Sequence, residues 1–203
     1  MPDSLDNFGF RDLRLERSDS LKPRERILKT AVALFNERGV HTIGIDKIIA
    51  ESGVSKRTFY NYFASKSDLI AAYLDFGHWH RFSGLREYIL PCNGDAKAEL
   101  VAIFDFLEHW FSEEDFRGCA FARGLNDFSD QESKNLREKV MLHFDAWATF
   151  IRNRLTTFLP ADRVERVLPQ FLALITGATV VAHASGNAGI AQLNKSIAIQ
   201  LLA

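Results

Sequence analysis

The sequence predicts an all-α protein in which an N-terminal three-helix domain precedes a larger helical domain. Apolar residues recur three and four positions apart along most of the chain, which is the period of an amphipathic helix. Glycine and proline, which end helices, divide this pattern into separate segments. The stretch 44–63, GIDKIIAESGVSKRTFYNYF, is the most informative of these segments, because it predicts two short helices joined by a tight turn.

The chain before this stretch predicts an arm and one helix. Residues 1–19 mix acids and arginines without a sustained apolar period, so we expect a mobile N-terminal arm. A helix is expected from about Pro23, which suits a first turn, to Arg38, and Gly39 ends it. Its role would be to brace the two short helices that follow. Its apolar stripe is Ile27, Leu28, Ala31, Leu34 and Phe35.

The stretch 44–63 has a stop signal and a start signal between its two helices. Gly53 stands where a helix end favours a residue that tolerates the left-handed conformation. Ser55 is placed to cap the next helix, because its hydroxyl can accept hydrogen bonds from free N–H groups of the first turn. The second helix is expected over Lys56–Tyr62 with Phe59 facing inward. The buried stripe of the first helix would be Ile45, Ile48 and Ile49.

The outward side chains of the second helix suit DNA. Cations attract phosphates or donate to guanine edges, an asparagine can pair with an adenine edge, and hydroxyls can bind phosphate oxygens. Two helices with a short glycine-containing turn form a helix-turn-helix, whose second helix enters the major groove. Without DNA, the same residues would make a solvated helix that merely packs on its neighbour. The candidate DNA-binding residues are Ile45, Lys56, Arg57, Thr58, Tyr60, Asn61, Tyr62 and Lys66.

These candidates divide by expected role. Lys56 and Arg57 stand at the start of the reading helix and are the best candidates for contacts to base edges. Lys66 opens the next helix, expected over 66–89, where free N–H groups help to bind a phosphate. Ser65 and Asp68 fit a capping box at that point. The remaining hydroxyl-bearing candidates, Thr58, Tyr60 and Tyr62, are expected to contact phosphates.

The rest of the chain is also predicted to be helical. We expect helices over 95–111, one or two short helices over 113–128 broken by Gly118 and Gly124, and a long helix capped by Ser129 or Asp130 that ends near Leu159. Its apolar positions include Leu136, Val140, Leu142, Phe144, Trp147, Ile151 and Leu155. Two further helices follow over 163–184 and 190–202, the last with Leu193, Ile197 and Leu201 in a stripe. These two are more apolar than a surface pair requires, so they either form a central core or pack against a second subunit.

The N-terminal part resembles a known family. RILKTAVALFNERG at 26–39 and IDKIIAESGVSKRTFYNYFASKSDL at 45–69 are similar to the DNA-binding domain of TetR-type (TetR/AcrR) transcriptional regulators. The pattern GVS-x-x-T-x-Y-x-x-F-x-x-K is in register over 53–66. Two positions depart from the family: Gly44 replaces a frequent Thr or Ser, and Arg57 stands where a small residue is common. We therefore carry over neither a phosphate contact at Gly44 nor a base preference.

The resemblance implies domains and partners. It implies a DNA-binding domain over 20–66 and a ligand-binding and dimerisation domain over 67–203. It also implies a homodimer through residues about 163–202, which suits a palindromic operator because one reading helix recognises only a few base pairs. A repressor released by a small-molecule inducer would follow from the common habit of the family. The pocket would be drawn from aromatic and polar residues of the second domain, of which the candidates are Trp110, Phe121, His143 and Trp147.

Composition agrees with a DNA-binding protein of the cytoplasm. The net charge is −1, yet residues 20–66 contain nine Lys or Arg against four acids, so the basic charge is concentrated there. Hydrophobic residues make up 47% of the chain, no apolar run approaches the roughly 18 residues of a membrane helix, and no secretory signal is visible. Cys92 and Cys119 match no zinc motif, and a redox role for Cys119 is left open.

Two other classes of function compete with DNA binding. An enzyme is not expected, because the chain has no Gly-rich phosphate loop, HExxH, GxSxG or paired metal-ligand spacing, and no cofactor is implied. A helical adaptor that binds another protein through its apolar last helices, without DNA, is the alternative function. Such an adaptor would have no need of the KRTFYNY surface at 56–62.

Overall fold

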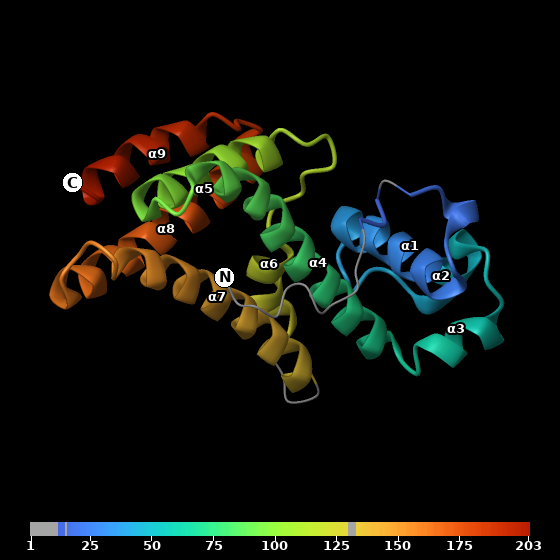
Figure 1. Cartoon of the computed structure of the whole chain (residues 1–203). Coiled ribbons are helices and arrows are strands. Elements are labelled where there is room, and N and C mark those ends of the chain that lie inside the picture. Colours follow the sequence, from blue (N-terminus) through green and yellow to red (C-terminus); the bar gives the residue numbers. More distant parts are fainter. Residues whose placement is uncertain (1–11, 15, 130–132) are drawn as a thin grey trace. The chain divides into compact units, whose positions relative to one another are not determined.

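The computed structural model describes residues 12–14, 16–129 and 133–203, and these residues form helices, turns and loops (Figure 1). The all-α class predicted from the sequence is confirmed. The α-helices of the described residues are α1 (Pro23–Arg38), α2 (Ile45–Ser52), α3 (Lys56–Tyr62), α4 (Lys66–Ile89), α5 (Ala96–Phe111), α6 (Ala120–Asp127), α7 (Lys134–Leu155), α8 (Ala161–Ser185) and α9 (Ile190–Leu201). Two short 3-10 helices, η2 (Ser18–Ser20) and η3 (Leu90–Cys92), accompany them.

The chain forms two compact units, each assembled from separate stretches. Of the described residues, the head unit contains 12–14, 16–80, 120–129 and 133–141, and the core unit contains 81–119 and 142–203. Helices α4 and α7 each begin in the head unit and end in the core unit.

Helix α1 is the centre of the head unit. It packs against α2 and α3, and its predicted apolar stripe is buried throughout. Ile48 of α2 and Phe59 of α3 are fully buried, and Phe63, directly after α3, is also buried. Ile45 and Ile49 are only half-buried, so the expected stripe of α2 is centred on Ile48.

The described residues before α1 include two buried leucines and several contacts to the rest of the chain. Leu13 and Leu21 are buried, and Lys29 of α1 donates from Nζ to the backbone carbonyls of Arg14, at 3.4 Å, and Glu16. Burial raises the pKa of the Asp12 carboxyl, but hydrogen bonds and charge from Arg14 outweigh it and hold the pKa below its usual value. The described part of the expected arm therefore differs from a free segment, and residues 1–11 lie outside the described residues.

Helix α6 completes the head unit by packing against both α7 and α1. An added Cβ at Gly124 would lie 2.8 Å from Val140 and 3.2 Å from Phe128, so glycine permits the close approach of α6 and α7. Arg123 of α6 donates to the Asn36 carbonyl of α1 at 3.4 Å. Tyr73 of α4 donates to the Asn36 side chain at 2.7 Å, which brings three helices together at one residue.

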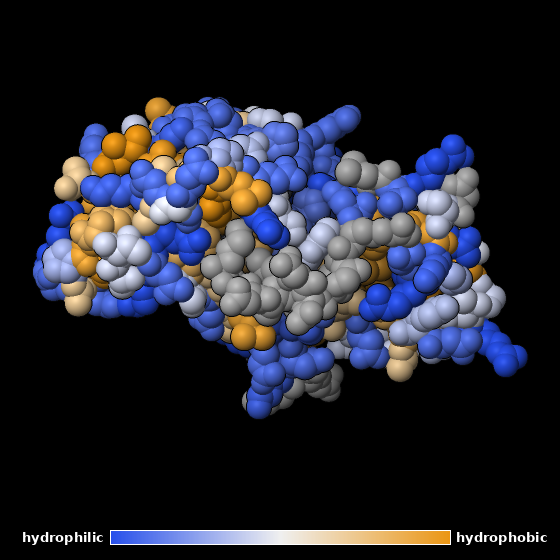
Figure 2. Space-filling model, in the orientation of Figure 1, coloured by the Kyte–Doolittle hydropathy of each residue, from blue (hydrophilic) through white to orange (hydrophobic). Residues whose placement is uncertain are grey.

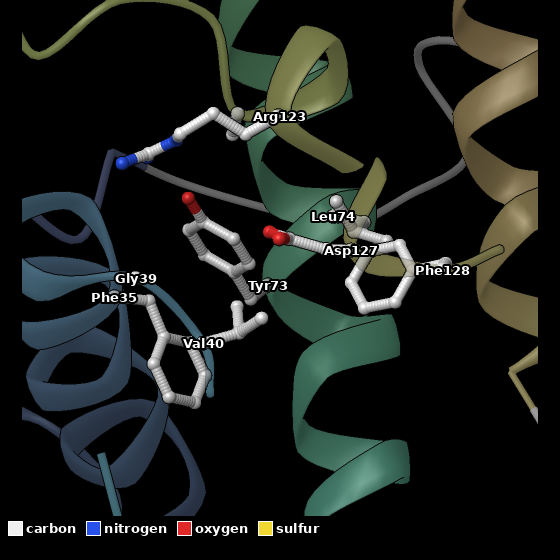
Figure 3. Close-up of a pocket in the computed structure, with 9 residues that line it drawn as sticks. Phe35, Gly39, Val40, Tyr73, Leu74, Arg123, Asp127 and Phe128 are labelled. Carbon is white, nitrogen blue, oxygen red and sulfur yellow. The ribbon is translucent and has the colours of Figure 1, made fainter. Parts of the chain in front are cut away.

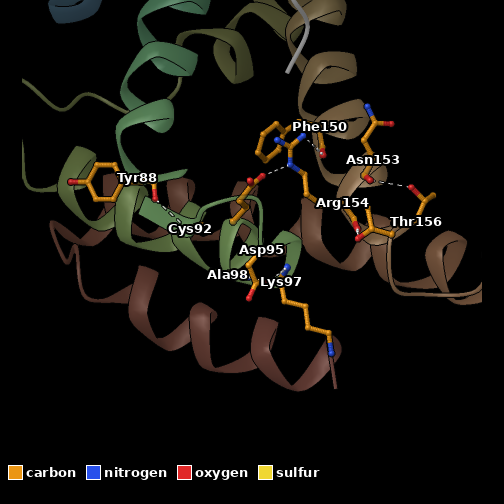
Figure 4. Close-up of polar contacts among 11 residues, drawn as sticks. Tyr88, Cys92, Asp95, Lys97, Ala98, Phe150, Asn153, Arg154 and Thr156 are labelled. Carbon is orange, nitrogen blue, oxygen red and sulfur yellow. Dashed lines mark hydrogen bonds and ion pairs between the residues drawn. The ribbon is translucent and has the colours of Figure 1, made fainter. Parts of the chain in front are cut away.

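The core unit is built on α5, α8 and α9, which pack on one another. Their buried apolar faces form one cluster with the end of α4 and the second part of α7. Within it, Arg154 donates to Glu99 at 2.7 Å and stacks 3.7 Å from the ring centroid of Phe150 (Figure 4). Both charges of this pair are nearly buried, so removing either one would leave an uncompensated charge.

Helix boundaries from α1 to α5 match the prediction closely, whereas three later expectations were wrong: a break at Gly124, the cap of α7 and the end of α7. Residues 113–128 contain one helix, α6, and Gly124 lies inside it rather than breaking it. Helix α7 begins at Lys134, after the expected caps; Ser129 lies outside the helix, and Asp130 falls outside the described residues. Helix α7 ends at Leu155, before the expected Leu159.

Candidate nucleic-acid interface

The reading helix α3 is held in place by local signals on both sides. Gly53 has φ of 65° and ψ of 29°, the left-handed conformation expected at the end of α2. The Ser55 hydroxyl accepts a hydrogen bond from the Thr58 N–H at 3.0 Å and caps α3 as predicted. Phe59 packs against Phe63, with ring centroids 6.0 Å apart. These contacts fix a seven-residue helix that is too short to be stable alone.

The outer face of α3 presents polar groups on aromatic and aliphatic stems. Lys56, Arg57 and Asn61 are exposed, and Tyr60 and Tyr62 expose 44% and 46% of their surface. The Tyr60 ring packs edge-on against Phe59 at 5.3 Å, so its position is supported from behind. In Figure 2 the visible surface over α3 is mostly blue and white. We call Lys56, Arg57, Tyr60, Asn61 and Tyr62 the reading surface.

The other predicted DNA-binding residues are less exposed. Thr58 is half-buried, and its hydroxyl lies 2.8 Å from that of Ser55. Ile45 is half-buried in the first turn of α2. Lys66, the first residue of α4, is also half-buried, and this burial lowers the pKa of its ammonium group.

The start of α4 is fixed by a short polar contact. The Ser65 hydroxyl accepts a hydrogen bond from the Asp68 N–H at 3.1 Å and donates to the Asp68 carboxylate at 2.9 Å. The expected role of Ser65 as a cap is thus observed, while the Asp68 carboxylate binds the hydroxyl. Lys66 therefore projects from a well-defined helix start, a position that favours anions.

The structure adds one charged residue that the sequence interpretation missed. Asp46 in the first turn of α2 lies 3.8 Å from the Lys56 ammonium, measured from Oδ1 to Nζ. A second pair on the same helix joins Lys47 and Glu51 at 3.6 Å. The i,i+4 spacing of Lys47 and Glu51 is visible in the sequence. The pairing of Asp46 with Lys56 depends on how α2 and α3 cross, which spacing alone does not reveal.

Comparison with known proteins places this arrangement in a family. The family model "Bacterial regulatory proteins, tetR family" matches residues 27–73, which include α1, α2 and α3. A TetR-family transcriptional regulator of Streptomyces coelicolor has a similar structure, with a TM-score of 0.78, 25% sequence identity, and coverage of 89% of this chain and 94% of the other. The chain belongs to the TetR family. This TetR-family protein is therefore a DNA-binding transcriptional regulator and not an enzyme.

Sequence relatives of this TetR-family regulator agree with that assignment. An uncharacterised HTH-type transcriptional regulator of Mycobacterium tuberculosis is 25% identical over 169 residues, 79% of this chain and 84% of the relative. The HTH-type transcriptional activator FasR of Mycolicibacterium smegmatis is 35% identical over 89 residues, 42% of this chain and 41% of FasR. Family membership also rules out the alternative of a helical adaptor without DNA function.

The four candidate ligand-binding residues of the TetR-family regulator are all buried, in two different units. In the core unit, Phe82 packs against both His143, at 5.9 Å between ring centroids, and Trp147, at 5.1 Å. The Arg81 guanidinium lies over Trp110, with its carbon 3.3 Å from the centroid of the Trp110 ring. The fourth candidate, Phe121, belongs to the head unit, where its ring packs against the backbone at Gly77.

A small cavity of about 10 Å³ lies in the head unit between α1, α4 and α6 (Figure 3). Figure 3 shows the Tyr73 ring in the middle of this contact. A cavity of that size has room for about one water molecule, so it is no effector site in this conformation. None of the four candidate ligand-binding residues lines it. Among the described residues, no group of three or more His, Cys, Asp or Glu side chains is arranged to hold a metal ion.

Proposed function

We propose that this TetR-family regulator acts as a cytoplasmic homodimer that binds a palindromic operator, represses transcription and is released by a small-molecule inducer. Residues 20–66 would bind the operator and residues 67–203 would bind the inducer and the second subunit. The observation that carries the proposal is that the chain leaves two chemically different surfaces exposed. One is the reading surface of α3, and the other is an apolar surface of α8 and α9.

The apolar surface supports the homodimer. Helix α8 buries one face in the core unit and leaves the opposite face exposed, including Val180 and Val181. Three large residues of α9 are exposed as well: Leu193, Ile197 and Ile199. Figure 2 shows hydrophobic residues on the surface over α9. Exposed apolar patches of this kind mark protein interfaces, and a second copy presenting the same patch would cover it symmetrically. We call these five residues the C-terminal surface.

The same helix meets the length and composition of a membrane span. Helix α8 is 25 residues long, and its apolar window is 39% buried within the protein. Eight of its residues, from Val164 to Ala182, are buried, so α8 is a partly buried core helix. Packing of its outer face against a second subunit would account for the remaining apolar positions without a membrane.

Inducer binding requires a second conformation of the core unit. The candidates Trp110, His143 and Trp147 are packed against other aromatic side chains in this conformation. A ligand that entered among them would have to separate these rings. It would shift the regulator toward a state with low operator affinity only if it bound that state more tightly than the present one. The ligand would be largely apolar with a few polar groups, as such a pocket would be.

Helix α4 would carry the signal, because it begins beside the reading helix and continues into the core unit. Its start bears Lys66, a proposed phosphate contact, and its later residues join the apolar cluster of the core unit. A change in that cluster would therefore act on the same helix that carries Lys66.

Fluorescence anisotropy with the DNA upstream of the protein's own reading frame tests the proposal. Tight saturable binding, with two or four chains per duplex and far weaker binding to a scrambled duplex, is expected. Equal weak binding to both duplexes, and to duplexes selected from random DNA, would overturn it. Transcription from the same DNA should fall when the protein is added. A rise would instead assign the activating role that FasR bears in its name.

A further inference from the structure

An ion pair between Asp46 and Lys56 joins the two helices of the helix-turn-helix. Asp46 belongs to the first turn of α2, and Lys56 is the first residue of α3. The two side chains are 92% and 69% exposed, and their charged atoms are 3.8 Å apart. If Lys56 reaches a base edge, as proposed above, the Asp46 carboxylate lies at the same DNA surface.

Neither stability nor DNA attraction explains this carboxylate well. An exposed ion pair contributes little to stability, because both charges remain solvated. A negative charge beside the reading helix repels phosphates and so weakens binding to every DNA sequence. An acid in the first turn does interact favourably with the helix dipole, but that contribution is small at an exposed position. The cost to DNA affinity indicates a role in discrimination between sequences.

We propose that Asp46 is a specificity-determining residue that acts through Lys56. A lysine is a point charge on a flexible stem and binds any phosphate within reach. At a DNA surface, where water is partly excluded, the Asp46 carboxylate attracts the Lys56 ammonium more strongly than in free solution. It also disfavours phosphate oxygens at the same place, so Lys56 is held for base edges. On non-operator DNA Lys56 finds no matching base edge, and the carboxylate disfavours the phosphate contact that the lysine would otherwise make, which raises the free energy of the wrong complexes. This inference rests on the proposed base contact of Lys56.

Asp46→Asn tests the inference, because it removes the charge while keeping the size of the side chain. Glu51→Gln is the matched control: Glu51 is the other acid of α2 that pairs with a lysine, and its partner in that ion pair is Lys47 instead of Lys56. Both variants remove one negative charge from the head unit, so any general gain in DNA affinity is shared. Fluorescence anisotropy would measure the affinity of each variant for the operator, obtained by selection from random duplexes, and for a scrambled duplex. Both affinities would be measured at one fixed salt concentration.

Asp46→Asn is expected to lower the ratio of operator to scrambled affinity about tenfold, within the range of one lost base contact. The larger part of this change should be tighter binding to the scrambled duplex. Glu51→Gln should change the ratio less than about twofold, as expected for a charge that acts equally on all sequences. Equal changes in the ratio for Asp46→Asn and Glu51→Gln would mean that the loss of one negative charge causes the effect wherever it lies, and would overturn the inference.

A double-mutant cycle of Asp46 and Lys56 separates this inference from the proposed function. In a Lys56→Met background, Asp46→Asn should no longer lower the ratio, because the residue through which it acts is absent. An undiminished effect in that background would show that Asp46 acts without Lys56, and the inference would fail alone. If Lys56→Met by itself leaves the ratio and the base preference unchanged, the proposed base contact fails and the inference fails with it. Thermal melting of each variant checks that α2 remains folded.

Discussion

The reading surface and the C-terminal surface are both exposed, yet they leave different atoms outside. The reading surface ends in ammonium, guanidinium, amide and phenol groups carried by a helix of seven residues. The C-terminal surface ends in methyl groups carried by helices of 25 and 12 residues. In both cases the opposite side of the helix is packed in the protein, Phe59 behind α3 and Phe171 and Ala198 behind α8 and α9.

This difference shows that exposure alone does not identify a partner, whereas the atoms left exposed do. Polar tips on rigid stems match phosphates and base edges, whose own groups are polar and fixed in position. Burial of apolar groups lowers the free energy because water leaves the two apolar surfaces that come into contact. A second copy of the same surface would supply the matching apolar partner. The proposed operator complex needs both surfaces, because a dimer presents two reading helices to two half-sites.

The largest effect is expected from breaking the C-terminal surface. Leu193→Glu combined with Ile197→Glu places charges where a second subunit would bury apolar groups, so the protein should become monomeric. Operator affinity should fall about 100-fold or more, since each monomer holds only one half-site. Analytical ultracentrifugation and anisotropy would measure the two effects.

Leu90→Glu provides a control for that experiment. Leu90 and Leu193 are 63% and 62% exposed, so both substitutions replace an equally exposed leucine by a charge. Leu90 lies in η3, outside the C-terminal surface, and its variant should remain dimeric. If Leu90→Glu dissociated the protein as well, exposure and not this particular surface would be the cause.

The next largest effect is expected from removing a cation of the reading surface. Arg57→Ala should weaken operator binding by about 1–3 kcal/mol and relax base preference at one position, as loss of a bidentate base contact does. Arg38→Ala is the control, because Arg38 is an exposed arginine of the same unit at the end of α1. Equal losses for both arginines, on operator and scrambled DNA alike, would assign Arg57 to phosphate attraction only.

The sequence could predict the N-terminal helices closely because their ends depend on local chemistry. Gly39 and Gly53 have φ of 80° and 65°, a region that favours glycine, and the Ser55 cap uses a neighbour three residues away. The same local argument gave a wrong prediction at Gly124. It looks like a helix breaker in sequence but lies within α6, where contact with Val140 and Phe128 leaves no room for a side chain.

The sequence could not predict which apolar residues face outward. Leu142, Leu193 and Ile197 fit helical stripes, but all three are exposed. Periodicity places residues on one face of a helix without saying whether the neighbouring surface belongs to the same chain. Asp46 was missed for a related reason, because its partner is on another helix and the crossing of α2 and α3 is a tertiary property.

A smaller effect is expected from the cap that fixes the reading surface. Ser55→Ala should lower the free energy of unfolding by about 1 kcal/mol, because the Thr58 N–H loses its acceptor. Ser196→Ala is the comparison on α9: Ser196 donates to the Leu193 carbonyl at 2.7 Å within a helix, so its loss should leave stability nearly unchanged. Chemical denaturation would measure both, and a larger loss at Ser196 would contradict the dependence of the reading surface on local capping.

The smallest effect is expected from Lys66→Ala, and it separates phosphate contacts from base contacts. Lys66 stands at the start of α4 beside the Ser65 cap, so it is suited to one phosphate and carries no sequence information. Its loss should weaken operator and scrambled duplexes by the same factor and reduce the slope of log affinity against log salt by about 1. Anisotropy across a salt series would measure this slope. A change in base preference with Lys66→Ala, and none with Lys56→Ala, would reverse the roles assigned to the two lysines. The reading surface would then begin at α4, and the division between positioning and reading residues would have to be redrawn.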